Sequence, residues 1–195
     1  MTNLLVATTN RGKLAEITIL LEGVRFDVIT LAGWPDVPAP EETGSTFAEN
    51  ARDKALYYAA RTGELTVAED SGLEIEALDG APGVMSARFG GVDTPSQEKF
   101  ALIYDALRRK GAGGSPARFV SAVALVARDT ILFEARGTAE GRIAPEPRGQ
   151  GGFGYDPIFF YPPLGGTFAE LSAQKLTVSH RAEAFRALRE YLVQM

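Results

Sequence analysis

The sequence predicts an α/β fold, with a central mixed β-sheet and flanking helices arranged in two lobes around a cleft. Two patterns support this prediction. The chain opens with an apolar run, a polar turn and apolar residues at helical spacing, which is the strand–loop–helix start of an α/β unit. Residues 119–127 and 131–136 each predict a strand, and the turn-forming residues 128–130 between them predict a hairpin. The length of 195 residues and the 45% hydrophobic content suit one sizeable domain, which we expect to span residues 1–195.

The first part of the chain alternates predicted strands and helices. Residues 4–7 are an apolar run and predict a buried strand, which a polar turn follows. Residues 13–21 carry apolar side chains at helical spacing and predict a helix. Residues 26–31 predict a second strand, and residues 34–42, which contain three prolines, predict a loop.

Capping signals mark the next two helices. Thr46 and Glu49 have the Thr-x-x-Glu spacing of a capping box, and the helix behind them is expected to run to about Arg61. Residues 94–97 form a second capping signal, with proline at the first helical position, and this helix is expected to end before Gly111.

The remaining elements are shorter or carry polar motifs. Residues 65–68 predict a strand that ends in the polar motif 69–72, and residues 73–78 predict another extended segment. Residues 148–154 are rich in glycine and predict a loop. Ser179 is the expected N-cap of the last helix. The apolar residues expected on one face of that helix are Phe185, Leu188 and Leu192.

The composition excludes several classes of site. The net charge of −5 does not favour nucleic acid or an anionic membrane as a partner. The absence of cysteine excludes disulfides, a thiol nucleophile and cysteine-ligated metals, and the single histidine, His180, excludes multi-histidine metal sites. Any catalytic metal must therefore be held mainly by carboxylates, which favours Mg²⁺ or Mn²⁺. No signal-peptide pattern or bilayer-spanning apolar run is found, and we expect a cytoplasmic protein.

Two polar clusters in the first third of the chain could bind an anion. Residues 8–13 follow a strand and begin a helix, where backbone N–H groups and Lys13 favour an anion, although an ordinary polar turn fits equally well. The P-loop pattern is absent. Asn50 and Lys54 share a helix face behind the acidic residues 41–42, although a solvated helix start also explains this cluster, and capping is a sufficient explanation for Glu49.

Two further clusters lie later in the chain. Glu69 and Asp70 follow an apolar strand, where two carboxylates are costly without a metal or a cation, although an ordinary surface turn is the alternative. The glycines of residues 151–156 allow a close backbone approach to a flat ligand, and Phe153 offers a stacking face. Lys175, His180 and Arg181 complete this last cluster, for which a flexible loop and a first helical turn are the alternatives.

Taken in order, these clusters resemble the inosine triphosphate pyrophosphatase family, also called the Ham1 or dITP/XTP pyrophosphatase family. The matching stretches are residues 7–13, 42–51, 69–73, 80–88, 151–157 and 179–181. The resemblance implies a nucleotide-binding cleft between the two lobes, a homodimer, and Mg²⁺-dependent hydrolysis between the α- and β-phosphates of ITP, dITP and XTP. Two positions depart from the pattern: Glu69 stands where many bacterial members have Asp, and Met85 where Tyr is frequent.

The resemblance also implies roles for individual residues. Mg²⁺ is expected between Glu42 and Asp70, and Asp70 is the expected catalytic residue, as a base or as the group that positions the attacking water. The phosphates are expected at the N-terminal cluster, the purine ring on Phe153, and the keto edge of the base at the cationic C-terminal residues. The predicted substrate-binding residues are Thr8, Thr9, Asn10, Arg11, Gly12, Lys13, Lys54, Ser71, Phe153, Gly154, Tyr155, Asp156, Lys175, His180 and Arg181.

Two alternatives compete with this interpretation. A Maf-like nucleotide pyrophosphatase has a similar fold and reaction class, but is not expected to combine the Phe-Gly-Tyr-Asp and Ser-His-Arg motifs. A catalytically silent nucleotide-binding module would not need two metal-binding carboxylates beside Lys13 and Lys54. We therefore expect an enzyme that acts on a small purine nucleotide.

Overall fold

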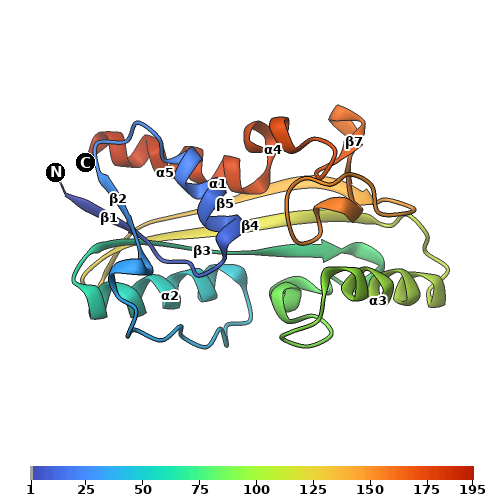
Figure 1. The fold of residues 1–195 in the computed structure, drawn as a ribbon, viewed down its shortest axis with the longest axis horizontal. Helices are drawn as coiled ribbons and strands as arrows, with labels where there is room; N and C mark the ends of the chain where they lie inside the picture. Colours follow the sequence, from blue (N-terminus) through green and yellow to red (C-terminus); the bar gives the residue numbers. More distant parts are fainter. Residues whose placement is uncertain (1) are drawn as a thin grey trace. The chain divides into compact units, whose positions relative to one another are not determined.

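The computed structural model describes residues 2–195 and forms a seven-stranded sheet with flanking helices, as predicted (Figure 1). The strands are β1 (Asn3–Val6), β2 (Asp27–Thr30), β3 (Leu65–Ile75), β4 (Pro116–Ala127), β5 (Thr130–Ile143), β6 (Phe159–Tyr161) and β7 (Gly166–Thr167). The helices are α1 (Arg11–Leu20), α2 (Phe47–Thr62), α3 (Ser96–Arg109), α4 (Ser172–Val178) and α5 (His180–Gln194). The strand order is β2-β1-β3-β4-β5-β6-β7. The sheet is mixed, because β1 is parallel to β2 and β3 whereas β6 is antiparallel to β5 and β7.

The chain divides into two compact units. Unit 1 contains Met1–Asp70, Ser121–Gly137 and His180–Met195, and unit 2 contains Ser71–Val120 and Thr138–Ser179. The nucleotide-binding cleft and the single domain over residues 1–195 stay predictions. No helix in residues 2–195 has the length and apolar character needed to cross a membrane.

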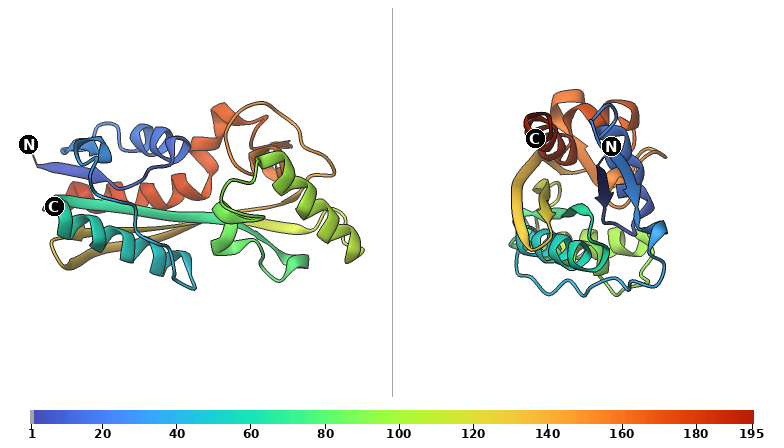
Figure 2. Two further views of the ribbon diagram at one scale, coloured as in Figure 1. Left: turned by 60° about the horizontal axis from the view of Figure 1, so that its bottom comes forward. Right: turned by 90° about the vertical axis from the view of Figure 1, so that its left-hand side faces the viewer.

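Unit 1 has helices on both faces of its part of the sheet. Helices α1 and α5 lie together on one face and α2 lies on the other (Figures 1 and 2). Leu4 and Val6 of β1 pack against Ile17 of α1 and against Phe185 and Leu188 of α5 in one buried cluster. The predicted apolar face of the last helix is therefore confirmed.

Helix α2 begins where the capping box predicted. The Thr46 hydroxyl accepts a hydrogen bond from the Glu49 N–H, and the Glu49 carboxylate accepts one from the Thr46 N–H. Gly63 ends the helix in the left-handed conformation, with φ of 74°, which glycine adopts without steric cost. The second capping signal is wrong in detail, because the N-cap of α3 is Pro95 and no side chain caps this helix.

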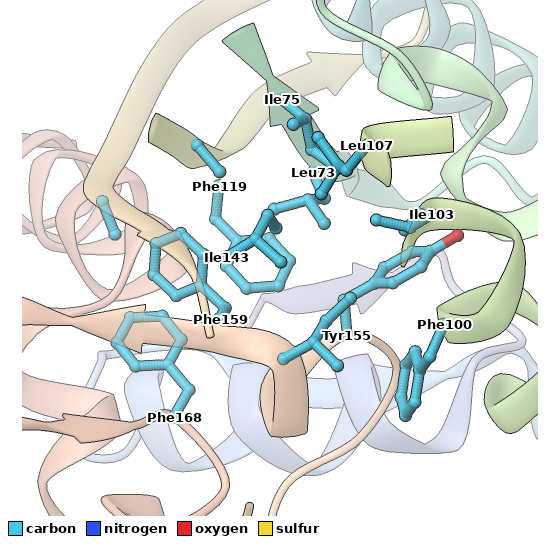
Figure 3. Packing of buried hydrophobic residues seen from close by; sticks show 13 residues of the cluster. Leu73, Ile75, Phe100, Ile103, Leu107, Phe119, Ile143, Tyr155, Phe159 and Phe168 are labelled. Atoms are coloured by element: carbon cyan, nitrogen blue, oxygen red, sulfur yellow. The ribbon is translucent and has the colours of Figure 1, made fainter. Parts of the chain in front are cut away.

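Unit 2 is built around a cluster of apolar and aromatic side chains (Figure 3). Phe100, Ile103 and Leu107 recur at helical spacing and are buried on one face of α3. Phe159 lies 4.7 Å from Phe119, measured between ring centroids. Aromatic pairs at this separation contribute about 0.5–1.5 kcal/mol beyond the burial of their area.

The predicted end of the strand at residues 69–72 is wrong, because β3 continues through this motif to Ile75. The motif is polar, but both carboxylates form hydrogen bonds within the fold. The strand can therefore continue, because the carboxylates do not have to reach solvent. Gly72 allows a close approach in the same strand, since a Cβ atom there would lie 2.3 Å from the Ser86 hydroxyl oxygen. That hydroxyl accepts a hydrogen bond from the Leu73 N–H at 2.9 Å. Strands β6 and β7 and helix α4 were not predicted.

Candidate active site

The turn between β1 and α1 emerges beside β3. The Ala7 N–H donates to the Val67 carbonyl at 2.8 Å, so the chain leaves β1 next to the polar residues that follow in β3. Asn10 is the N-cap of α1, and its side-chain oxygen accepts from the Lys13 N–H at 3.0 Å. The Asn10 N–H in turn donates to the Thr8 hydroxyl at 3.2 Å. These local bonds give the turn a defined conformation at the N-terminus of a helix, where anions bind favourably.

The Lys13 side chain reaches two carboxylates of β3. Its ammonium nitrogen lies 3.0 Å from Glu69 Oε2 and 3.7 Å from Asp70 Oδ1. The side chain keeps 15% of its surface exposed, whereas the Glu69 side chain is fully buried. The ammonium group is therefore held from the protein side, and the side chain as a whole stays partly exposed.

Glu69 is the centre of a buried ionic network. Its Oε1 accepts from the Ser121 hydroxyl at 2.9 Å and from Arg181 Nε and Nη2 at 3.1 and 2.9 Å. Arg181 Nη1 lies 2.5 Å from a carboxylate oxygen of Glu16. Burial opposes the ionisation of Glu69, but the charges of Arg181, Lys13 and His180 outweigh burial and hold its pKa well below the ordinary value.

Asp70 is also buried, with 5% of its surface exposed. Its Oδ2 accepts from the Asn50 side-chain amide at 3.0 Å, and Asn50 Oδ1 accepts from the Gly44 N–H at 2.8 Å. Burial is the main cause that raises the pKa of Asp70, and the Glu42 carboxylate raises it further. The opposing effects of Lys13, Lys54 and the Asn50 hydrogen bond are smaller in sum. A carboxyl group with a raised pKa is typical of acid–base sites.

Helix α2 positions Lys54 near Asp70. Lys54 lies one turn after Asn50 on the helix and forms a close ion pair with Glu42, which comes from the loop before α2. The Lys54 side chain keeps 12% of its surface exposed and the Glu42 side chain 26%. Two ammonium groups, Lys13 and Lys54, therefore lie beside the two carboxylates predicted to bind metal.

Glu42 and Asp70 could hold a metal ion only if other ligands complete its coordination. Across residues 2–195, no group of three or more His, Asp or Glu side chains is placed so that it could hold a metal ion. Glu42 and Asp70 are nevertheless close enough for the charge of Glu42 to raise the pKa of Asp70, and a shared cation would relieve that repulsion. Mg²⁺ is commonly bound by one or two carboxylates together with substrate phosphates and water. The pair therefore fits an ion whose coordination is completed by substrate and water.

Unit 2 holds a second polar cluster at the glycine-rich loop. Asp156 Oδ2 accepts from the Lys175 ammonium at 2.6 Å and from the Phe153 N–H at 2.8 Å. The Lys175 nitrogen also lies 4.6 Å from the centre of the Phe153 ring, which is a cation–π contact. Gly152, with φ of 71°, is required here because a Cβ atom would lie 2.1 Å from Asp156 Oδ2. A buried ion pair thus supports both the loop conformation and the position of the Phe153 ring.

Tyr155 is part of the core of unit 2. Figure 3 shows its ring near Ile103 and Phe100, and its hydroxyl donates to the Ser86 carbonyl at 2.8 Å. Burial raises the pKa of Tyr155 above the ordinary value. These contacts give Tyr155 a structural role, and its predicted contact with substrate stays a prediction.

The predicted site residues fall into two groups. Unit 1 contains Thr8, Thr9, Asn10, Arg11, Gly12, Lys13, Glu42, Lys54, Asp70, His180 and Arg181, and unit 2 contains Ser71, Phe153, Gly154, Tyr155, Asp156 and Lys175. Lys175 was predicted to act together with His180 and Arg181, but it pairs with Asp156, whereas Arg181 pairs with Glu69 and Glu16.

Sequence reasoning identified no partner for four residues of these networks, which are Glu16, Asn50, Glu69 and Ser121. The sequence offered a signal for Ser121, because it is the lone hydroxyl residue within the apolar run of β4. The structure shows that Ser121 is fully buried. Glu16 lies three residues after Lys13 on α1, but this spacing does not reveal that its partner is Arg181.

Comparison with known proteins agrees with this arrangement of motifs. Residues 4–191 match the model of the Ham1 family. The chain belongs to the Ham1 family. Among curated Ham1-like relatives, a dITP/XTP pyrophosphatase of Gloeobacter violaceus is 49% identical over 186 residues, which cover 95% of this chain and 91% of the relative. A dITP/XTP pyrophosphatase of an Exiguobacterium species is 44% identical over 191 residues, covering 97% and 96%.

Solved structures of the Ham1 family have the same fold. A Ham1 protein from Coxiella burnetii superposes with a TM-score of 0.92 at 39% identity, with both chains covered completely. A nucleoside-triphosphatase / dITP/XTP pyrophosphatase from Mycobacterium abscessus gives a TM-score of 0.75 at 39% identity, over 96% of this chain and 97% of that chain. The predicted α/β architecture is thus the architecture of the Ham1 family.

Proposed function

We propose that this chain hydrolyses non-standard purine nucleoside triphosphates, namely ITP, dITP and XTP, to the nucleoside monophosphate and pyrophosphate. The observation that carries the proposal is the cluster in unit 1, where Lys13 and Lys54 lie beside Glu42 and Asp70. Cations for a phosphate chain and carboxylates for a metal are what such a hydrolysis needs. Relatives named dITP/XTP pyrophosphatase, at 44% and 49% identity, support the choice of substrate.

The phosphate chain would bind at the start of α1 and near α2. Lys13 and Lys54 supply positive charge, and the turn of Thr8 and Asn10 supplies hydrogen bonds and helix N–H groups. Thr9 of the same turn, and Arg11 and Gly12 in the first turn of α1, are included in the proposal. Lys54 would exchange its ion pair with Glu42 for phosphate oxygens.

We propose that Glu42 and Asp70 hold Mg²⁺. The ion, when bound, would neutralise phosphate oxygens and favour departure of pyrophosphate. Asp70 would also orient the attacking water and accept its proton. Asn50 supports this role, because its hydrogen bond to Oδ2 fixes the orientation of the Asp70 carboxylate.

The base would stack on Phe153, whose backbone and ring are held by Asp156 and Lys175. Ser71, Gly154 and Tyr155 would complete the nucleotide contacts. We keep the proposal that Lys175, His180 and Arg181 direct donors to the 6-keto edge of the base, and we add that Arg181 also fixes Glu69. A cytoplasmic homodimer with one domain over residues 1–195 completes the proposal, and light scattering after gel filtration tests the dimer.

A substrate panel tests the function. ITP, dITP, XTP, GTP and ATP are incubated with the protein and Mg²⁺, and released pyrophosphate is measured with a coupled enzyme assay. We expect turnover of ITP, dITP and XTP and little turnover of ATP. Asp70→Asn is the control, because it should fold normally yet lose roughly 10²–10⁴-fold in kcat. Tight binding of ITP without release of pyrophosphate would indicate a silent binding module and contradict the proposal.

A further inference from the structure

Glu69 is a charged residue with no access to solvent or to a ligand. Its side chain is fully buried, and both carboxylate oxygens have cationic partners within unit 1. Oε1 accepts from Arg181 at 2.9 and 3.1 Å and from the Ser121 hydroxyl at 2.9 Å. These bonds define the position of the carboxylate, and its second oxygen, Oε2, is directed at Lys13.

Lys13 has two competing carboxylate partners. Its ammonium nitrogen is 3.0 Å from Glu69 Oε2 and 3.7 Å from Asp70 Oδ1. Glu69 therefore holds the ammonium at a hydrogen-bonding distance, and Asp70 is the alternative partner at a longer distance. Loss of the charge at Glu69 would leave Asp70 as the nearer anion, and Lys13 would move toward it.

That movement would impair two groups at once. Lys13 would no longer present its ammonium to the phosphates, and Asp70 would form a closer ion pair that competes with metal and water. The geometry points to Glu69 as a positioning residue that keeps the Lys13 ammonium available to the substrate phosphates and away from Asp70; this inference rests on the proposed function. Glu69 itself does not contact substrate, because its side chain is buried beneath Lys13.

A double-mutant cycle tests this role. Glu69→Gln, Lys13→Met and the combination are compared with the wild type in kcat and KM for ITP at saturating Mg²⁺. Glutamine keeps an acceptor for Ser121 and Arg181 but removes the charge. We expect Glu69→Gln to lower kcat/KM about 10- to 100-fold in the wild-type background and less than about 2-fold in the Lys13→Met background, since coupled residues of one ionic network are non-additive.

The conservative variant Glu69→Asp restores the charge and should recover most of the kcat/KM that Glu69→Gln loses. Glu134→Gln is the matched control, because it removes a carboxylate of unit 1 whose ion pair with Arg52 is exposed, and it should behave like the wild type. If Glu69→Gln does not fold by circular dichroism, Ser121→Ala replaces it in the cycle. Ser121→Ala removes one donor to Glu69 Oε1 without a change of charge. Its loss of kcat/KM should be smaller than that of Glu69→Gln and should also disappear in the Lys13→Met background.

Two results overturn the inference while leaving the proposed function intact: an active wild type with an unaffected Glu69→Gln, or a loss that is equal in both backgrounds. Equal losses would mean that Glu69 acts only through the stability of the fold. A wild type that releases no pyrophosphate from ITP would instead overturn the proposed function, on which the role of Lys13 depends.

Discussion

The ion pair between Lys175 and Asp156 offers a quantitative prediction for unit 2. The two charged atoms are 2.6 Å apart, and the side chains keep only 3% and 2% of their surface exposed. Lys175→Met removes the ammonium and leaves the Asp156 carboxylate buried, with the Phe153 N–H as a remaining donor at 2.8 Å. Removing one partner of a buried pair typically costs about 3–5 kcal/mol in the free energy of unfolding, and the remaining hydrogen bond favours the lower end.

The measurement is equilibrium unfolding in urea, with thermal unfolding as a second probe. For a chain of this size, the predicted loss corresponds to a fall in Tm of roughly 6–20 °C. The double variant Lys175→Met with Asp156→Asn should recover most of the loss, because it removes both charges together. Lys110→Met is the matched control: its pair with Asp79 is exposed, at 48% and 88%, and this variant should unfold like the wild type.

The same variants should affect the nucleotide. Asp156 holds the backbone of Phe153 and Lys175 lies over its ring, so loss of the pair should raise KM for ITP. A Lys175→Met protein as stable as the Lys110→Met control, or a double variant whose losses simply add, would refute the assignment of an energetically coupled buried pair.

Three further predictions concern unit 1. Asn50→Leu removes a hydrogen bond that lowers the pKa of Asp70, so the pKa of Asp70 rises further. Asp70 must be ionised for activity, and activity is lost as pH falls through this pKa, so the acid limb of the pH profile of kcat/KM should move to higher pH. An acid limb at the wild-type pH would exclude Asp70 as the titrating group. EDTA should abolish turnover and added Mg²⁺ should restore it, and Glu42→Gln should raise the Mg²⁺ concentration needed for half-maximal rate. Full activity in EDTA would mean that Glu42 and Asp70 do not bind a metal required for turnover. Arg181→Lys should lower the ratio of kcat/KM for ITP to kcat/KM for ATP, because lysine lacks the planar donor set that can pair with a 6-keto oxygen. Equal losses of kcat/KM for both substrates would mean that Arg181 serves only to pair with Glu69 and Glu16 and does not read the base.

Local signals in the sequence predicted the local structure. The Thr46 and Glu49 capping box fixed the start of α2, and the apolar spacing of the last helix predicted its buried face. The polar turn after β1 forms as predicted, although α1 begins at Arg11, two residues before the predicted start. Such features depend on neighbours in the sequence and are accessible without a structure.

Long-range pairing was not accessible in the same way. Glu69 and Arg181 are separated by 112 positions, and Ser121 donates to Glu69 across 52. A charged residue in an isolated motif fits a turn as well as a strand, so the strand was predicted to end at residues 69–72, with an ordinary surface turn as the alternative. Only the buried partners explain why β3 continues through it. For the same reason the sequence grouped Arg181 with Lys175 as donors to the base and did not reveal that each has its own carboxylate partner.

The central claim is cleavage between the α- and β-phosphates. Phosphorus NMR of ITP, incubated with the protein and Mg²⁺ until the substrate is consumed, tests it most directly. Our account predicts the resonances of IMP and pyrophosphate, without an IDP signal at any time in the reaction. Growth of IDP together with orthophosphate would contradict it.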